Sequence, residues 1–319
     1  MKFDLTTFGE AMIRISVRPG QTLENATRAD LYTGGSEANV AVCLARLGMK
    51  AAWLSRLTDN PLGRRVERDL ARHGVDTSAI IWTQQDRVGT YYVEYAAPPR
   101  SAAVTYDRRD SAVSRIIPKE IDWKLLLNTR ALHLTGITPA LSPSCRQTVA
   151  LAIRKARAKK IPVSFDVNYR AKLWTPAEAA KTLAPFLRQA TIVIMTQADA
   201  AALFHLRGEP AQVVRQIKDR FRCPIAVLTV GGAGCWAWDG KNLYQELGYP
   251  LKEVIDRLGA GDAFAAGFLY GFLHQDLRLG LRYGVATSAM KLSMRGDHFW
   301  SSRSEVEQVI QSRGGDVRR

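Results

Sequence analysis

Residues 256–264 read Asp-Arg-Leu-Gly-Ala-Gly-Asp-Ala-Phe, and an apolar stretch continues from there to Leu273. Glycines in front of an apolar run predict a tight turn that opens a buried helix, with Asp262 in its first turn. The first N–H groups of a helix lack internal partners and can hold a phosphate. A neighbouring carboxylate can take a proton from an attacking hydroxyl. The stretch therefore indicates phosphoryl transfer to an alcohol with Asp262 as base, or else a plain turn that Asp262 caps.

Outward from this turn, strand-like apolar runs alternate with helical stretches. Strands are expected at Asp4–Phe8, Ala51–Ser55, Ala131–Leu134, Val163–Asp166, Ile192–Met195 and Ile225–Val230. Helices are expected at Glu37–Leu47, Leu62–His73, Ser144–Ala158, Pro176–Arg188 and Pro210–Arg220. This alternation predicts an α/β fold with a central, mainly parallel sheet and helices on both faces. Ligands of such folds bind at the carboxyl ends of the strands.

Two stretches, Met12–Thr33 and Val88–Asp107, lack the helical period and alternate instead. They predict antiparallel strands that meet in one small β-sheet outside the main sheet. Such a sheet is expected to act as a lid or, as an alternative that need not exclude the first, as an edge where subunits pair into a homo-oligomer. The predicted division is a core of residues 1–11, 34–87 and 108–311, a β lid of residues 12–33 and 88–107, and a frayed tail of residues 312–319.

Composition limits the class of protein. The 319 residues are 46% hydrophobic and 24% charged, which is ordinary for globular proteins, and the net charge is +15. No nucleic-acid-reading motif accompanies the charge, so small anionic ligands are the better interpretation and no nucleic-acid partner is expected. No apolar run approaches the length of a membrane span, and the N-terminus does not read as a secretory signal. A cytoplasmic protein without a membrane partner is expected.

The cysteines and histidines predict no metal or disulfide framework. The four cysteines form no C-x-x-C pair and read as reduced core residues. The five histidines (His73, His133, His205, His274 and His298) show no metal-ligand spacing.

Two further glycine segments carry polar groups. Gly34-Gly35 opens a helix and could be a hinge, and Asn39, one turn into that helix, could hydrogen-bond a polyol hydroxyl. At Thr229–Gly234 a buried strand ends in a glycine loop whose N–H groups could form a phosphate nest. Each segment alone could equally be a simple turn.

Taken together, these segments resemble the ribokinase-like, or PfkB-type, carbohydrate kinases. The resemblance covers nearly the whole chain and rests on GGSEANVAVCLARLG (34–48), TDNPLGRRVERDLARHGVD (58–76) and DRLGAGDAFAAGF (256–268). Within the family, the chain is most similar to the 2-keto-3-deoxygluconate kinases. That narrower resemblance is carried by segments 87–91, 106–108, 133–142, 164–170 with Leu173-Trp174, and 295–298.

The resemblance implies an ATP-dependent kinase that phosphorylates the terminal hydroxyl of 2-keto-3-deoxygluconate. A sugar acid needs a cation for its carboxylate, and Arg108 or Arg170 could bind it through two hydrogen bonds. The family pattern implies Asp262 as the catalytic base, with Gly259, Ala260 and Gly261 forming an anion hole. The implied substrate-binding residues are Gly34, Asn39, Tyr91, Tyr106, Arg108, Arg170, Asp262 and Asp297.

The same resemblance implies ATP and Mg²⁺ as cofactors. The implied nucleotide-binding residues are Thr196, Thr229, Gly231, Gly232, Gly234, Gly259 and Gly261. Two departures stand out: Arg257-Leu258 replaces the family's threonine, and Thr196–Asp199 replaces its Asn-x-x-Glu motif. Asp199 is then the expected metal residue, acting through water, with altered metal dependence. The alternatives are a kinase of another sugar, such as fructose or ribose, and a non-catalytic sugar sensor.

Overall fold

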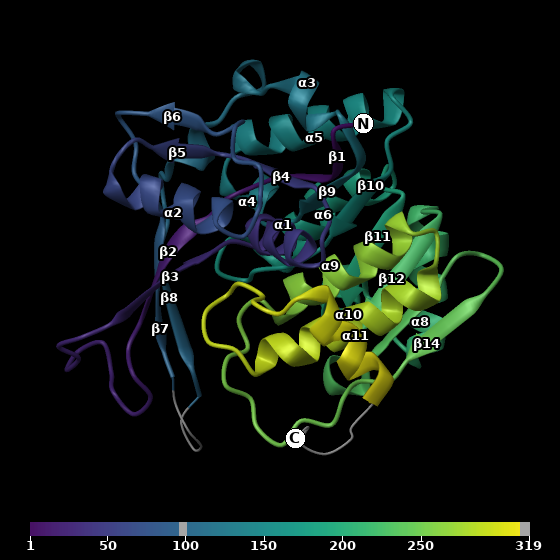
Figure 1. Ribbon diagram of the computed structural model, residues 1–319. Coiled ribbons are helices and arrows are strands. Elements are labelled where there is room, and N and C mark those ends of the chain that lie inside the picture. The colour runs from purple at the N-terminus through teal and green to yellow at the C-terminus, as the bar shows by residue number, and fades with distance from the viewer. Residues whose placement is uncertain (96–100, 313–319) are drawn as a thin grey trace.

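The computed structural model describes residues 1–95 and 101–312 (Figure 1). Its main sheet has eight strands, and only the last two in sequence run antiparallel to their neighbours. In spatial order the strands are β14 (Leu243–Glu246), β13 (Cys235–Trp238), β12 (Ile225–Thr229), β11 (Ile192–Thr196), β10 (Val163–Asp166), β9 (Thr129–Thr135), β1 (Phe3–Phe8) and β4 (Ala51–Leu54). The predicted mainly parallel sheet is confirmed.

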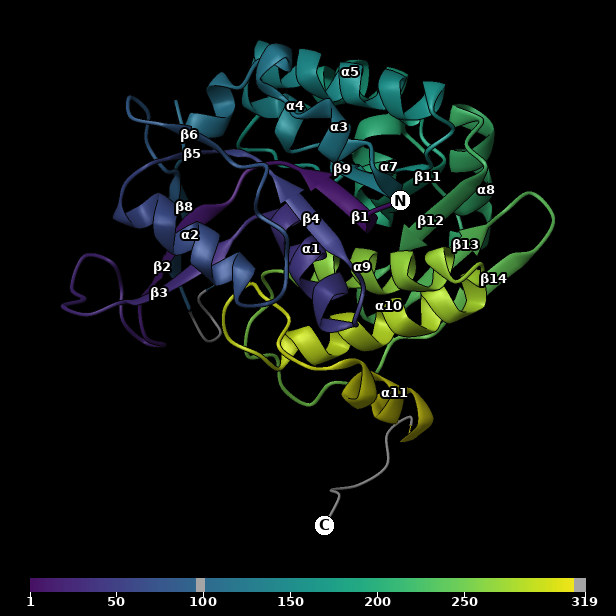
Figure 2. The same cartoon turned by 45° about the horizontal axis from the view of Figure 1, so that its top comes forward.

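Helices cover both faces of this sheet (Figure 2). One face carries α1 (Ser36–Arg46), α9 (Ala260–Leu273) and α10 (Leu277–Leu292), with α11 (Arg303–Ser312) packed on α10. The other face carries α3 (Trp123–Leu126), α4 (Thr138–Leu141), α5 (Pro143–Ala158), α6 (Pro176–Leu187), α7 (Gln197–Phe204) and α8 (Pro210–Phe221). Helix α9 is apolar around its whole circumference because it is buried between the sheet and α10.

A second sheet lies beside the main one, as Figure 1 shows, and consists of β3 (Asp30–Gly34), β2 (Met12–Ser16), β7 (Thr90–Glu94) and β8 (Ala103–Asp107). The prediction that the two stretches meet in one small sheet is confirmed. The prediction of purely antiparallel strands is wrong at one pair, because β2 runs parallel to β7. The long connection from β3 to β7 through the core permits this pairing, whereas β2–β3 and β7–β8 are antiparallel.

The rest of the chain joins these layers. Helix α2 (Pro61–Ala71) links β5 (Arg56–Thr58) to β6 (Ile81–Thr83), which form a two-stranded sheet. Short 3-10 turns lie at Ala112–Arg115, Pro118–Glu120 and Gly231–Ala233. Of the predicted tail, Ser312 ends α11, while residues 313–319, like residues 96–100 of the predicted lid, lie outside the described residues. Within the described residues, no helix is long and apolar enough to cross a lipid bilayer.

The strand order of the main sheet indicates where a ligand would bind. The chain proceeds from β1 to β4 on one side and then returns to β9 on the other side of β1. In doubly wound sheets the carboxyl ends of the strands near such a reversal form a crevice. Asp166, Thr196 and Thr229, the last residues of β10, β11 and β12, line a pocket together with Asp262. The turn at 256–264 therefore faces the carboxyl edge of the main sheet.

Candidate active site

Asp262 is the third residue of α9 and is 6% exposed. Its two carboxylate oxygens accept hydrogen bonds from Ser36 Oγ at 2.6 Å and Asn39 Nδ2 at 2.7 Å. Gly259 is the N-cap of α9, at φ 84°, and the helix has no side-chain cap. The alternative that Asp262 merely caps a turn is therefore wrong.

The partners of Asp262 come from the start of α1. Ser36 and Asn39 lie about one turn apart, so both face the same carboxylate. Asn168, after β10, donates to Ser36 Oγ at 2.8 Å and approaches Asp262 Oδ1 at 3.5 Å. Ser36 and Asn168 are not among the predicted site residues. The Asn39 amide, which we expected to meet a sugar hydroxyl, donates to the carboxylate.

The pKa of Asp262 is raised by burial, and the hydrogen bonds from Ser36 and Asn39 oppose that shift. A raised pKa makes the carboxylate a stronger base without removing it from the hydrogen bonds that orient it. Arg170 also lowers the pKa of Asp262 through its positive charge.

Backbone amides at the start of α9 remain free of helical partners. The first intrahelical bond runs from Ala263 N to Gly259 O, at 2.9 Å, so the amides of Gly261 and Asp262 have no intrahelical acceptor. The amide of Ala260 instead donates to the Arg257 carbonyl at 3.4 Å. A Cβ added at Gly261 would meet no described atom within 4 Å. This helix start has both the donors and the space that an anion needs.

A pocket of about 350 Å³ joins the glycine loop after β12 to the start of α9. It brings together six of the seven predicted nucleotide-binding residues: Thr196, Thr229, Gly231, Gly232, Gly234 and Gly261. Gly259 lines the adjoining pockets instead. Thr196 Oγ1 accepts from the Asp199 amide at 2.9 Å, as the N-cap of α7. The opposite wall is largely apolar and includes Tyr249, Leu251, Phe264, Val285, Ala289 and Leu292.

A second pocket, of about 60 Å³, is lined by Asp262 itself. It brings together all eight predicted substrate-binding residues: Gly34, Asn39, Tyr91, Tyr106, Arg108, Arg170, Asp262 and Asp297. The small sheet supplies the two tyrosines, from β7 and β8. This pocket is called the sugar pocket below.

The tyrosines and Gly34 form a tight wall of the sugar pocket. Tyr91 and Tyr106 stack with ring centroids 5.8 Å apart. A Cβ on Gly34 would lie 2.2 Å from Tyr91 Oη and 2.6 Å from the Asp297 carboxylate. Gly34 is therefore required by packing as well as by any ligand.

The two predicted carboxylate-binding arginines differ in their surroundings. Arg108 forms an ion pair with Glu10, which also accepts from Ser111 Oγ. Glu10 was not predicted, and it balances the charge of Arg108. Among the described residues, the Arg170 guanidinium forms no ion pair or hydrogen bond. The site thus contains one cation in a direct ion pair and one, Arg170, that acts on the carboxylates of Asp166, Asp199 and Asp262 only through its charge.

Beyond Arg108 and Arg170 the sugar pocket continues into a basic vestibule of about 400 Å³. Its further basic residues are Arg109, Arg115 and Lys172. Positive charge gathered around one opening attracts anionic ligands. Part of the large positive net charge is thus concentrated at this site.

Arg14 of β2 is fully buried and forms ion pairs at 2.7 Å with both Asp256 and Asp297. Tyr95 donates to Asp256 at 2.7 Å. These contacts link the small sheet to the loop before α9, which carries Asp256, and to the loop after α10, which carries Asp297. Sequence reasoning missed this cluster because Arg14 lies in an alternating strand, where a charged residue usually indicates a solvent-facing position.

Two further carboxylates lie near Asp262. Asp166 is the last residue of β10, and Asp199 lies in the first turn of α7. Burial raises the pKa of both Asp166 and Asp199, and for Asp166 the charges of Asp262 and Asp199 raise it further. A divalent cation would relieve this repulsion, so the donor set fits Mg²⁺. Asp199 was predicted, whereas Asp166 was noted only as part of the DVNYR segment.

Arg257-Leu258, which replaces the family's threonine, places a cation and an apolar side chain at the ligand pockets. Arg257 lines the pocket of about 350 Å³, so a cation stands where the family has a threonine. Leu258 lines the sugar pocket. The contact of either residue with a ligand stays a prediction.

Glu37 lies buried beneath the site and accepts from Thr135 Oγ1 and Thr138 Oγ1, each at 2.7 Å. In the part of the chain that the structure describes, its Oε2 has no hydrogen-bond partner. Burial raises the pKa of Glu37 to about 7. A buried carboxyl that is half protonated near neutral pH was not predicted.

Known carbohydrate kinases resemble this chain over nearly its whole length. A family model described as pfkB family carbohydrate kinase matches residues 2–302. A 2-dehydro-3-deoxygalactonokinase of Haloferax volcanii is 37% identical over 320 residues, covering 99% of both chains. A 5-dehydro-2-deoxygluconokinase of Bacillus subtilis is 28% identical and covers 97% of this chain and 96% of its own.

The solved structure of a 2-dehydro-3-deoxygluconokinase from Thermotoga maritima superposes with a TM-score of 0.89 at 29% identity. The superposition covers 97% of this chain and 99% of that one. It confirms the fold that the sequence resemblance implies, including the small separate sheet.

Proposed function

The chain belongs to the pfkB family of carbohydrate kinases, and we propose that it transfers the terminal phosphate of ATP to the terminal hydroxyl of a 2-keto-3-deoxy sugar acid. The gluconate-derived acid is the substrate predicted from sequence. The relative from Haloferax volcanii is named for the galactonate-derived epimer, and the Thermotoga structure for the gluconate-derived one. Both epimers therefore belong to the proposed substrate class.

The observation that carries this proposal is that Asp262 and its neighbour in the chain line two different pockets. Asp262 lines the sugar pocket, and its neighbour Gly261 lines the pocket of about 350 Å³. A hydroxyl in the first pocket and a phosphate in the second would meet beside a buried carboxylate of raised pKa. This is the arrangement that proton removal and in-line phosphoryl transfer require.

In the proposed reaction, Asp262 accepts the proton of the terminal hydroxyl, and that oxygen forms a bond to the γ-phosphorus of ATP. The bond from the γ-phosphorus to the bridging oxygen breaks, and its electron pair leaves with ADP. The amides of Gly261 and Asp262 donate to the phosphoryl oxygens as charge redistributes. Ser36 and Asn39 keep the carboxylate in one orientation throughout.

Mg²⁺ would be held by Asp166 and Asp199, through water, near the phosphates. When bound, it supplies positive charge that offsets the charge of the polyphosphate. The apolar wall of the pocket of about 350 Å³ suits the base of a nucleotide, and its glycine loop suits the phosphates.

Preference for an acid rests on Arg170. Its guanidinium has no direct ion pair or hydrogen bond among the described residues and lines both the sugar pocket and the basic vestibule. A neutral sugar offers this cation no carboxylate, whereas the carboxylate of a sugar acid can accept two hydrogen bonds from it. Arg108 could also bind the substrate carboxylate if it gave up part of its ion pair with Glu10.

The test is ADP release from ATP and Mg²⁺ with each epimer and with neutral sugars such as fructose and ribose. We expect turnover with at least one of the two acids, and a kcat/KM for neutral sugars lower by about 100-fold or more, since a desolvated charge-assisted pair contributes about 2–3 kcal/mol. Arg170→Ala should remove most of this preference, whereas Arg188→Ala, an exposed arginine at the end of α6, should retain it. Equal turnover of acids and neutral sugars would contradict the proposed substrate class.

A further inference from the structure

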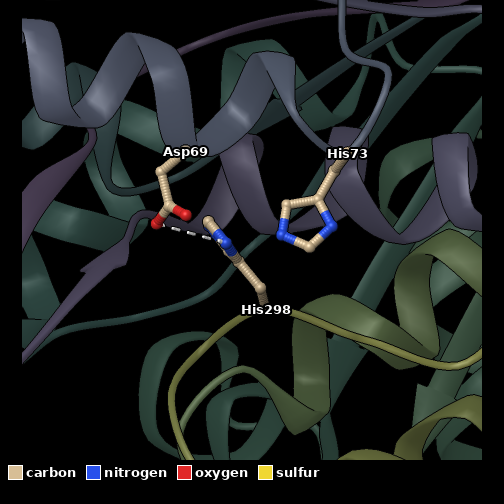
Figure 3. Close-up of side chains that lie close together, drawn as sticks. All are labelled: Asp69, His73 and His298. Carbon is tan, nitrogen blue, oxygen red and sulfur yellow. Dashed lines mark ion pairs between the residues drawn. The ribbon is translucent and has the colours of Figure 1, made fainter.

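Three potential metal ligands outside the kinase site lie together at the end of α2. Asp69 and His73 are four residues apart, and His298 reaches them from the loop after α10. One potential ligand atom from each residue lies within 4.8 Å of the other two. Figure 3 shows the carboxylate and the two imidazole rings gathered between α2 and that loop. Sequence spacing did not indicate this group, because His298 is distant in sequence from Asp69 and His73.

One ring nitrogen of each histidine in this cluster has no hydrogen-bond partner among the described residues. His73 and His298 are 6% and 3% exposed, and within residues 1–95 and 101–312 the Nε2 atom of each meets no hydrogen-bond partner. His298 Nδ1 lies 3.7 Å from Asp69 Oδ2, too far for a hydrogen bond. Buried polar atoms usually have hydrogen-bond partners, so the two Nε2 atoms without partners need an explanation.

We propose that Asp69, His73 and His298 bind a divalent transition metal ion of the zinc type. Imidazole nitrogen together with one carboxylate oxygen is a donor set that suits zinc and its neighbours, whereas Mg²⁺ prefers oxygen ligands. Tetrahedral ligands at about 2.0–2.1 Å lie about 3.3 Å from one another. Small side-chain rotations would bring the three atoms to that spacing.

The surroundings hold these ligands in place. Arg72 binds Asp69 Oδ1 at 2.5 Å, which leaves Oδ2 toward the rings. Trp300 packs edge-on against His73, with ring centroids 4.5 Å apart. Burial lowers the pKa of both histidines, that of His73 to about 4, and a metal ion binds imidazole in its neutral form.

The site would connect two parts of the molecule. Asp69 lies in the last turn of α2 and His73 in the turn that follows it. His298 directly follows Asp297, which pairs with Arg14 and lines the sugar pocket. A bound ion would therefore fasten α2 to the loop that carries Asp297. This inference does not depend on the proposed function, because metal binding is measured without substrate.

The experiment uses the full chain without a histidine tag, freed of metal by dialysis against a chelator. Zn²⁺ is titrated by calorimetry in the presence of excess Mg²⁺, and Tm is measured with and without Zn²⁺. We expect one Zn²⁺ per chain and a higher Tm. His73→Gln and His298→Gln should each weaken binding at least about tenfold. His205→Asn, a change at an exposed histidine that keeps a residue tolerant of its left-handed backbone, should bind as the parent does.

Because a variant could fail to fold, Co²⁺ is also added to the unmodified chain and its visible spectrum recorded. Intense bands of a four-coordinate site, abolished by one equivalent of Zn²⁺, would support the proposal. Weak octahedral bands, no saturable Zn²⁺ binding, or binding that both histidine substitutions leave unchanged would overturn it.

Discussion

At the scale of single residues, the chemistry depends on how Asp262 is held. Its carboxylate receives one hydrogen bond from a hydroxyl and one from an amide, both on α1. The sequence motif identified the carboxylate, because the glycine turn and the apolar helix are adjacent to it. It did not identify Ser36 or Asn168, because their roles arise only when α1 and the end of β10 meet. Arg14 was missed because its partners Asp256 and Asp297 are distant in sequence.

Asp262→Asn should lower kcat by about 10²–10⁴-fold, the usual contribution of a positioned base, while the KM values for both substrates stay within a few-fold. Asparagine is nearly isosteric, and the Ser36 hydroxyl can accept as well as donate, so the local contacts persist. Steady-state kinetics check this. Asp276→Asn, the same change at the N-cap of α10, is the control and should retain full kcat. Undiminished kcat in Asp262→Asn would refute the assignment of the base.

Glu37 provides a test by pH. Its pKa in the folded protein is about 7, above its ordinary value of 4.5, so the protonated form favours folding. That contribution is complete below about pH 4.5 and is lost as the pH rises through 7. Relative to Glu37→Gln, the parent should lose about 3 kcal/mol of unfolding free energy over this range, at about 1.4 kcal/mol per pKa unit. Urea denaturation at several pH values measures this, and parallel curves for the two proteins would disprove the assignment.

At the scale of elements, the sequence predicted the alternating strands and helices of the core well, since hydrophobic periodicity and helix caps are local signals. Val163–Asp166 was predicted with the bounds that the structure has, and the other predicted elements lie close to theirs. The parallel pairing of β2 with β7 could not be predicted, because the chain between them carries no local signal of strand direction. The lid role of the small sheet and its use in subunit pairing stay predictions.

The start of α9 gives an element-scale test. Gly261→Ala should leave the free energy of unfolding unchanged or raise it by up to about 1 kcal/mol, because alanine favours a helix and the added Cβ meets no described atom within 4 Å. The methyl group would nevertheless occupy the space at the start of α9 where we propose that phosphate binds, so kcat/KM for ATP should fall at least about tenfold. Denaturation and kinetics on the same sample measure both effects.

Gly259→Ala is the contrasting variant. Gly259 has a φ of 84°, and an added Cβ would lie 2.2 Å from the Asp297 carbonyl oxygen, so this change should lose stability as well as activity. Full ATP turnover by Gly261→Ala would show that phosphate does not approach the helix there.

At the scale of the whole molecule, a buried ion cluster joins the small sheet to the core. Arg14→Ala should lower the free energy of unfolding by about 3–5 kcal/mol, because it leaves Asp256 and Asp297 buried without their cation. Urea denaturation tests this. Arg87→Ala removes an exposed ion pair with Asp107 from the same small sheet and should change stability little. Equal effects of the two substitutions would show that the buried cluster does not hold the sheet to the core.

The most direct test of the central claim is a competition for limiting ATP. Equimolar 2-keto-3-deoxy sugar acid, with both epimers present, and fructose are offered to the protein with Mg²⁺, and the phosphorylated products are resolved by mass spectrometry. Because Arg170 lines the sugar pocket without a direct ion pair among the described residues, the sugar-acid phosphate should exceed the fructose phosphate by about 100-fold, as a desolvated charge-assisted pair of about 2–3 kcal/mol allows. Fructose phosphate in equal or larger amount, or no phosphorylated sugar acid, would contradict the account.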